Sequence, residues 1–120
     1  MPIIHIRSLQ PHDPLAVDRA LGAVAEEVAA ACGCDVGDVW CTFTPVQRMT
    51  IGATPVEGEG RIAYLDVLMR PRAAGSDAQV LEAAATAVAR HLGLPLEDVW
   101  AHLVPLRPGE VLAGGALLAE

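Results

Sequence analysis

The residues with the clearest chemical potential stand at the start of the chain, where Met1 is followed by Pro2. A small second residue favours removal of Met1, and we expect this to leave Pro2 as a terminal secondary amine. All eight basic residues are arginine, so the terminus is the amine that the sequence offers. The pKa of an ordinary terminal amine is about 7.7–8, and an apolar pocket or a nearby arginine lowers it. Pro2 is therefore a candidate general base near neutral pH, or a general acid if its pKa stays high; the alternative is that it only begins an edge strand.

A second candidate is the triplet Arg70-Pro71-Arg72, which follows a predicted strand. Two guanidinium groups at a strand end suit a carboxylate, both by charge and by their bidentate geometry. The alternative is a solvated surface turn, in which paired arginines contribute little.

An internal repeat organises the elements that must position these residues. Segment 32–40 recurs as segment 92–100, a shift of 60 residues, and both segments end in Asp-Val-Trp. At the same shift Arg70 and Arg72 correspond to Gln10 and His12, so the two copies differ at the arginine pair.

Each copy predicts a strand, a helix and a second strand. Asp13 and Pro14 are a favoured helix start, and Gly33 is a plausible helix end. Apolar residues between them recur at spacings of three and four, as an amphipathic helix requires. The predicted strands span Ile3 to Leu9, Val39 to Thr44, Ile62 to Met69 and Val99 to Val104, and the second helix ends before Gly93.

We therefore expect a single α/β (α+β) domain made of two βαβ repeats, about residues 1–55 and 61–120. Strand-helix-strand units of this length close with parallel strands. The expected product is a four-stranded, mainly parallel sheet with both helices on one face. The other face would carry Trp40, Trp100, Tyr64 and further apolar residues, so we expect other copies of the chain to cover it.

Composition narrows the class of protein. The net charge of −7 argues against nucleic acid as a partner, and no apolar run approaches the roughly 18 residues of a membrane span. Because the sequence also lacks a secretory signal pattern, we expect a cytoplasmic protein. The three cysteines have no CxxC spacing, and no cluster of side chains has metal-ligand spacing, so we interpret the cysteines as small buried apolar residues and expect neither a metal nor a cofactor.

The repeat, together with the opening Met1-Pro2-Ile3-Ile4, resembles the tautomerase superfamily, which includes 4-oxalocrotonate tautomerase and malonate semialdehyde decarboxylase. Val99-Trp100, followed after Pro105 by the stretch from Gly109 to Gly115, is similar to the family's closing strand and hairpin. The resemblance covers almost the entire chain. It implies a cofactor-independent enzyme in which the N-terminal proline amine moves a proton, and a homotrimer, as in the longer members.

The resemblance also implies roles for three further residues. Asp38 corresponds to an acidic residue beside the proline in the decarboxylase branch, although Asp98 takes the same place in the second copy, which favours a structural role. His102 aligns with a tyrosine that the dehalogenase branch uses; the alternative is an interface residue. Trp40, a candidate substrate contact, stands where 4-oxalocrotonate tautomerase has an arginine, and Ala113 stands where the dehalogenase branch has a glutamate.

The sequence thus predicts a tautomerase or isomerase that catalyses enol-keto proton transfer on a small 2-oxo or enol carboxylic acid. Pro2 would move the proton, and Arg70 and Arg72 would hold the carboxylate. Two alternatives remain open: decarboxylation of a 3-oxo acid by the same residues, and a catalytically inactive binding protein with the same fold.

Overall fold

The computed structural model describes residues 2–9, 13–56, 62–71 and 76–118. Its main elements are β1 (Ile3–Leu9), α1 (Pro14–Cys32), β2 (Trp40–Val46), β5 (Ala63–Met69), α2 (Ser76–Leu92) and β6 (Val99–Pro105). Short 3-10 turns, η1 (Val36–Asp38) and η2 (Leu96–Asp98), precede β2 and β6. Two small hairpins follow these strands, β3 (Thr50–Ile51) with β4 (Thr54–Pro55), and β7 (Leu112–Ala113) with β8 (Ala116–Leu117).

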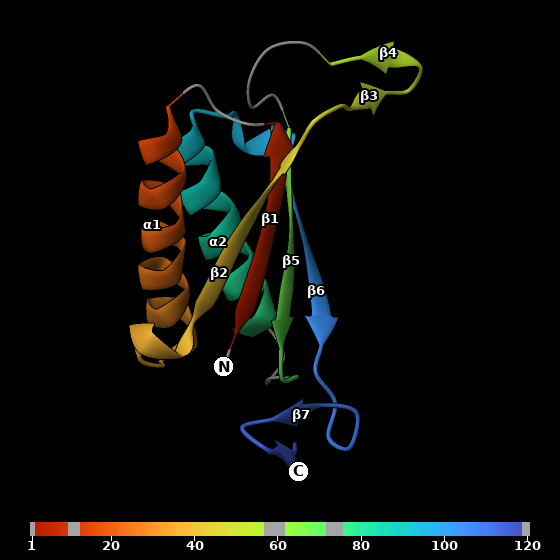
Figure 1. The fold of residues 1–120 in the computed structure, drawn as a ribbon. Coiled ribbons are helices and arrows are strands. Elements are labelled where there is room, and N and C mark those ends of the chain that lie inside the picture. Colours follow the sequence, from red (N-terminus) through yellow and green to blue (C-terminus); the bar gives the residue numbers. More distant parts are fainter. Residues whose placement is uncertain (1, 10–12, 57–61, 72–75, 119–120) are drawn as a thin grey trace.

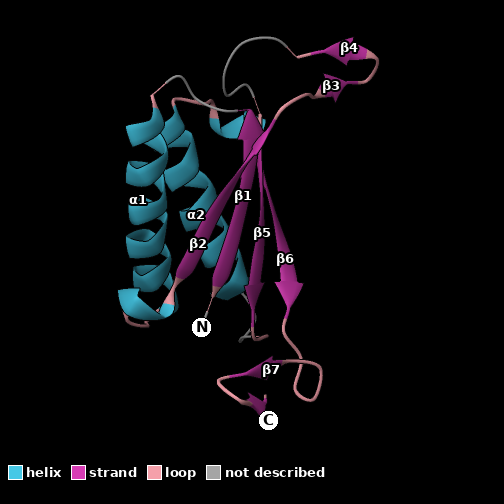
Figure 2. Cartoon of the chain, in the orientation of Figure 1, coloured by secondary structure: helices cyan, strands magenta, loops and turns pink. Residues whose placement is uncertain are grey.

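The four long strands form one mixed sheet in the order β2-β1-β5-β6. The pairs β1–β2 and β5–β6 are parallel, and β1 and β5 run antiparallel where the two repeats meet. Both helices lie on the same face of this sheet, and the opposite face is left open (Figure 1). The hairpins extend beyond opposite ends of the sheet (Figure 2). The predicted fold class is therefore confirmed.

The helices begin and end where the local residue types require. The Asp13 side chain accepts a hydrogen bond from the backbone N–H of Leu15, 3.0 Å away, and Pro14 occupies the first turn, where its missing N–H costs nothing. Gly33 ends α1 with φ 72°, in the left-handed region that favours glycine, and Gly93 follows α2 with φ 69°.

The core lies between the sheet and the helices. Alternate residues of β1 and β5 point into it, and their partners are valines and alanines of α1 and α2. Ala84 and Ala87 are completely buried, and such small residues let the two helices pack closely. The largest buried side chains are Ile4, Ile6, Leu65, Val24, Val28, Val67, Val80 and Val88.

The repeat is not in perfect register, which corrects one comparison made from the sequence. Ile4 pairs with Cys41, and the equivalent pair in the second half is Leu65 with Ala101. The second strands are thus related by 60 residues, but the first strands by 61. A shift of one residue moves a strand's side chains to the other face, so Arg70 does not correspond to Gln10 structurally. It corresponds to Leu9, the last residue of β1.

Candidate active site

Pro2 lies at one end of the sheet, immediately before β1. It is buried, and its carbonyl oxygen accepts a hydrogen bond of 3.1 Å from the backbone N–H of Trp40. Because β1 and β5 are antiparallel and Ile3 lies opposite Leu68, the start of β1 and the end of β5 meet at this sheet end. Arg70 follows the last residue of β5 and is exposed there. The structure therefore brings Pro2, Trp40 and Arg70 to the same end of the sheet, which is called the proline end below.

Asp38 also belongs to the proline end. It is the last residue of η1, two positions before Trp40, and it is exposed. Its backbone N–H donates to the carbonyl oxygen of Asp35 at 3.0 Å, and the N–H of Asp98 donates to Pro95 in the same way and at the same distance. Both aspartates thus occupy equivalent turns, but only Asp38 is near the start of the chain. The other predicted arginine, Arg72, lies outside the described residues.

His102 is not beside Pro2 within one chain. It lies on β6, an edge strand of the sheet. Its side chain is on the open face, three residues before the strand ends. The strand geometry puts it about 10 Å from the proline end along the strands, and about 10 Å across two strand spacings. A single chain therefore groups Pro2, Asp38, Trp40 and Arg70, and leaves His102 apart.

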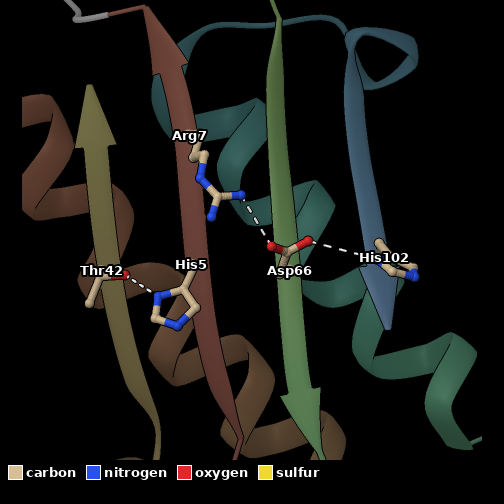
Figure 3. Close-up of polar contacts among 5 residues, drawn as sticks. All are labelled: His5, Arg7, Thr42, Asp66 and His102. Atoms are coloured by element: carbon tan, nitrogen blue, oxygen red, sulfur yellow. Dashed lines mark hydrogen bonds and ion pairs between the residues drawn. The ribbon is translucent and has the colours of Figure 1, made fainter. Parts of the chain in front are cut away.

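The surroundings of His102 form a polar row across the open face, shown in Figure 3. Thr42, His5, Asp66 and His102 lie side by side on the four strands, in the pairing register of the sheet. The His5 ring nitrogen Nδ1 is hydrogen-bonded to the Thr42 hydroxyl. One oxygen of Asp66 lies 3.8 Å from His102 Nδ1.

The other Asp66 oxygen accepts a hydrogen bond of 3.1 Å from Arg7, whose guanidinium also lies over the Tyr64 ring, 5.8 Å from its centre. A carboxylate in the middle of a strand needs a partner. The partner is Arg7 of the same chain. The alternation of both strands could have shown that Arg7 and Asp66 share the open face, but only the antiparallel pairing of β1 with β5 makes them neighbours.

Aromatic and apolar residues flank this polar row. Trp40, Ile3, Leu68 and Val104 form one neighbouring row, and Tyr64 and Trp100 belong to the other. Trp40 is 57% exposed and Trp100 is 70% exposed, which are large values for tryptophan in a folded chain. The predicted apolar open face is therefore present.

The cysteines lie on the helix side of the fold. Cys32 is buried and Cys34 and Cys41 are partly buried. Burial raises the pKa of the Cys41 thiol to about 11, which keeps it protonated and unreactive near neutral pH. Among the residues that the structure describes, no group of three histidine, cysteine or carboxylate side chains is arranged to hold a metal ion.

An apolar groove of about 260 Å³ lies away from the proline end. Leu81 and Ala85 of α2, Leu96 of η2, and Val99 and Ala101 at the start of β6 line most of it. The proline end is at the other end of β6, so the groove is not part of the candidate site.

Known proteins resemble this chain in three-dimensional structure. No family model matches the chain, and no curated protein matches it. Solved structures do match. A fused 4-OT, solved as a symmetric trimer, has a TM-score of 0.83 and 22% sequence identity, over 98% of this chain and 95% of that one.

Two further structures extend the likeness. Malonate semialdehyde decarboxylase has a TM-score of 0.70 and 20% identity, over 93% of this chain and 90% of that one. N1, a member of the cis-3-chloroacrylic acid dehalogenase family, has a TM-score of 0.80 and 17% identity, over 98% and 84%. These proteins are all tautomerase superfamily members, and the chain has their fold. None of the helices described here has the length and apolar character needed to cross a bilayer.

Proposed function

We propose that this protein is a tautomerase or isomerase that catalyses enol-keto proton transfer on a small 2-oxo or enol carboxylic acid. The observation that carries the proposal is the antiparallel pairing of β1 with β5, which puts Pro2 and Arg70 at one sheet end. A terminal amine and a fixed cation are the two groups that proton transfer on a carboxylic acid requires. The fold, shared with tautomerase superfamily members, supports the same conclusion.

Each residue at the proline end has a distinct role in the proposal. Pro2, once Met1 is removed, takes a proton from the substrate and returns it to another atom. Burial and a nearby arginine both favour the neutral form of an amine, which is the form a base needs. Arg70 pairs with the carboxylate, with Arg72 as its second contact, and Trp40 forms an apolar wall against the substrate. Asp38 orients the amine, and no cofactor takes part.

Decarboxylation of a 3-oxo acid is the second candidate. The likeness to malonate semialdehyde decarboxylase and the position of Asp38 at the proline end favour it. In that reaction the protonated amine of Pro2 would polarise the carbonyl group. The recurrence of the aspartate as Asp98, where there is no terminal amine, counts against a catalytic Asp38.

We also propose a homotrimer, in which the open sheet faces turn toward a shared threefold axis. The exposed tryptophans and the row of Ile3, Leu68 and Val104 need a cover, and a second copy carries the same surface. The fused 4-OT solved as a trimer supports this assembly. In a trimer, His102 of one subunit could approach the proline end of the next, which a single chain does not allow.

Light scattering tests the trimer with a matched pair of variants. Trp100→Ser removes an apolar side chain from the open face, whereas Leu15→Ser removes one that is 62% exposed on α1, in the helix layer. We expect wild type and Leu15→Ser to be trimers at micromolar concentration and Trp100→Ser to dissociate. A monomeric wild type would contradict the assembly.

Turnover of phenylpyruvate tests the activity, with intact mass measured on the same sample. We expect the mass of a chain without Met1, measurable enol-keto turnover, and a large but incomplete loss in Pro2→Ala, whose primary amine is less rigidly held. If the mass shows that Met1 is retained, the Pro2 nitrogen is an amide and cannot be a base. That result would favour the catalytically inactive binding protein.

A further inference from the structure

The segment Cys32-Gly33-Cys34 at the end of α1 places two thiols in contact. Cys32 is the last helical residue and is buried, and Cys34 is partly exposed. Gly33, with φ 72°, turns the chain, and the N–H groups of Gly33 and Cys34 both donate to the carbonyl oxygen of Ala29, at 2.8 and 3.1 Å. The Cys34 thiol hydrogen-bonds with the Cys32 thiol beside this cap.

The second repeat shows that the fold does not need sulfur at these positions. Leu92-Gly93-Leu94 forms the same cap: Gly93 has φ 69°, and the N–H of Leu94 donates to the carbonyl oxygen of Ala89 at 2.9 Å. Leucine in both places satisfies the packing requirement. The interpretation of all three cysteines as simple apolar residues therefore explains Cys41 but leaves the pairing of Cys32 with Cys34 unexplained.

We propose that Cys32 and Cys34 are a redox-active dithiol that closes reversibly to an intrachain disulfide. A low-molecular-weight disulfide such as oxidised glutathione is the oxidant. The more accessible Cys34, as thiolate, attacks one glutathione sulfur, forms a mixed disulfide and releases one glutathione thiol. Cys32 then attacks the Cys34 sulfur and releases the second. Two protein thiols lose two electrons and two protons in total, and one oxidised glutathione becomes two reduced ones.

The surroundings predict how this pair behaves. Burial, and then the neighbouring Cys32, raises the pKa of the Cys34 thiol. Because the thiolate is the nucleophile, closure is slow near neutral pH and becomes faster as the pH rises. Gly33 has no Cβ, so the backbone between the two cysteines can adjust to the short disulfide loop. Cys41, with a pKa of about 11, remains a thiol under the same conditions.

The test is to incubate the native full-length chain with excess oxidised glutathione, unfold it in urea together with an alkylating reagent that traps all free thiols, and measure intact and peptide masses. We expect the loss of two hydrogens, a Cys32–Cys34 link within one peptide, and a single alkylation, at Cys41. Excess reduced glutathione should restore three free thiols, the number in the sequence. A faster reaction at pH 9 than at pH 7 is expected from the raised pKa of Cys34.

Variants that copy the second repeat are the controls. Cys32→Leu with Cys34→Leu should keep the circular dichroism of the wild type and show no change in mass. Cys32→Leu alone should trap Cys34 as a stable glutathione adduct, because the resolving thiol is missing. A wild type that stops at a glutathione adduct, forms only disulfide-linked dimers, or stays unmodified while the urea-unfolded chain reacts would overturn the proposal. The wild-type masses decide it even if a variant fails to fold.

Discussion

The proline end of the sheet and the opposite end, which carries Trp100, are built by the same repeated unit but hold different chemistry. At each end a 3-10 turn ends in aspartate, and a strand with an exposed tryptophan follows it. Pro2 precedes β1 at the proline end, and its equivalent at the opposite end is Ala63, the first residue of β5. Ala63 is buried and lies in the middle of the sequence, so it has no terminal amine. Arg70 likewise has Leu9 as its structural equivalent. Features that recur serve the fold, and the features that do not recur are the candidates for function.

Core substitutions test whether the recurring features serve the fold, and we expect them to change stability the most. Ile4→Ala and Leu65→Ala remove equivalent, almost fully buried side chains from β1 and β5. We expect each to lower the free energy of unfolding by about 2–5 kcal/mol, because each loses burial and leaves a cavity. Urea unfolding at one fixed protein concentration measures both. If one variant were as stable as the wild type, the two strands would not be equivalent in the core.

Arg70→Gln tests whether a residue that does not recur in the other repeat serves function. A charged contact to a carboxylate contributes about 1.5–3 kcal/mol, so kcat/KM for an acidic substrate should fall about ten- to a hundredfold with Tm nearly unchanged. Arg72→His should have a smaller effect of the same kind. Arg48→Gln, at an exposed position before β3, is the control and should change neither quantity. Unchanged kinetics in Arg70→Gln would make it a surface arginine, and a large loss of stability would make it an interface residue.

The paired aspartates Asp38 and Asp98 separate a catalytic role from a structural one. If Asp38 acts on Pro2, Asp38→Asn should lower kcat about tenfold, the low end for a lost charged contact, and alter its pH profile. Asp98→Asn should leave both unchanged, although it removes the equivalent carboxylate. Equal effects of the two substitutions, in kinetics and in Tm, would assign both residues to the fold alone.

Cys41 and its equivalent Ala101 give the smallest expected effect, on stability at high pH. The unfolded thiol ionises near the ordinary pKa of 9.0, and the folded one near 11. Because the unfolded chain loses this proton first, the stabilising contribution is complete below pH 9 and declines as the pH rises toward 11. Cys41→Ala, which copies the second repeat, should lose less stability between pH 9 and 11 than the wild type. Parallel curves for the two proteins would contradict the assignment.

Local signals in the sequence predicted the elements well. Asp13, Pro14 and Gly33 mark the ends of α1 through side-chain capping and backbone conformation, which depend on adjacent residues only. The repeat predicted two βαβ units and one open sheet face. These features need no knowledge of which strands become neighbours.

Strand order is what the sequence could not provide. Alternation of apolar and polar residues shows which face a side chain takes, but it is the same for parallel and antiparallel neighbours. The contact between Arg7 and Asp66 and the proximity of Arg70 to Pro2 both depend on the antiparallel centre of the sheet. The one-residue offset between the first strands was hidden for the same reason, since the pairing register of the sheet reveals it.

Selective blocking of the terminal amine tests whether the Pro2 nitrogen moves the proton. The chain contains no lysine, so an amine-directed acylating reagent can modify only its terminus, and intact mass shows when one acyl group has been added. With Met1 removed, that group lies on the Pro2 nitrogen and abolishes its basicity. We predict that enol-keto turnover of phenylpyruvate disappears in proportion to acylation, while Tm and the oligomeric state are retained. Full turnover by the completely acylated protein would contradict the proline mechanism.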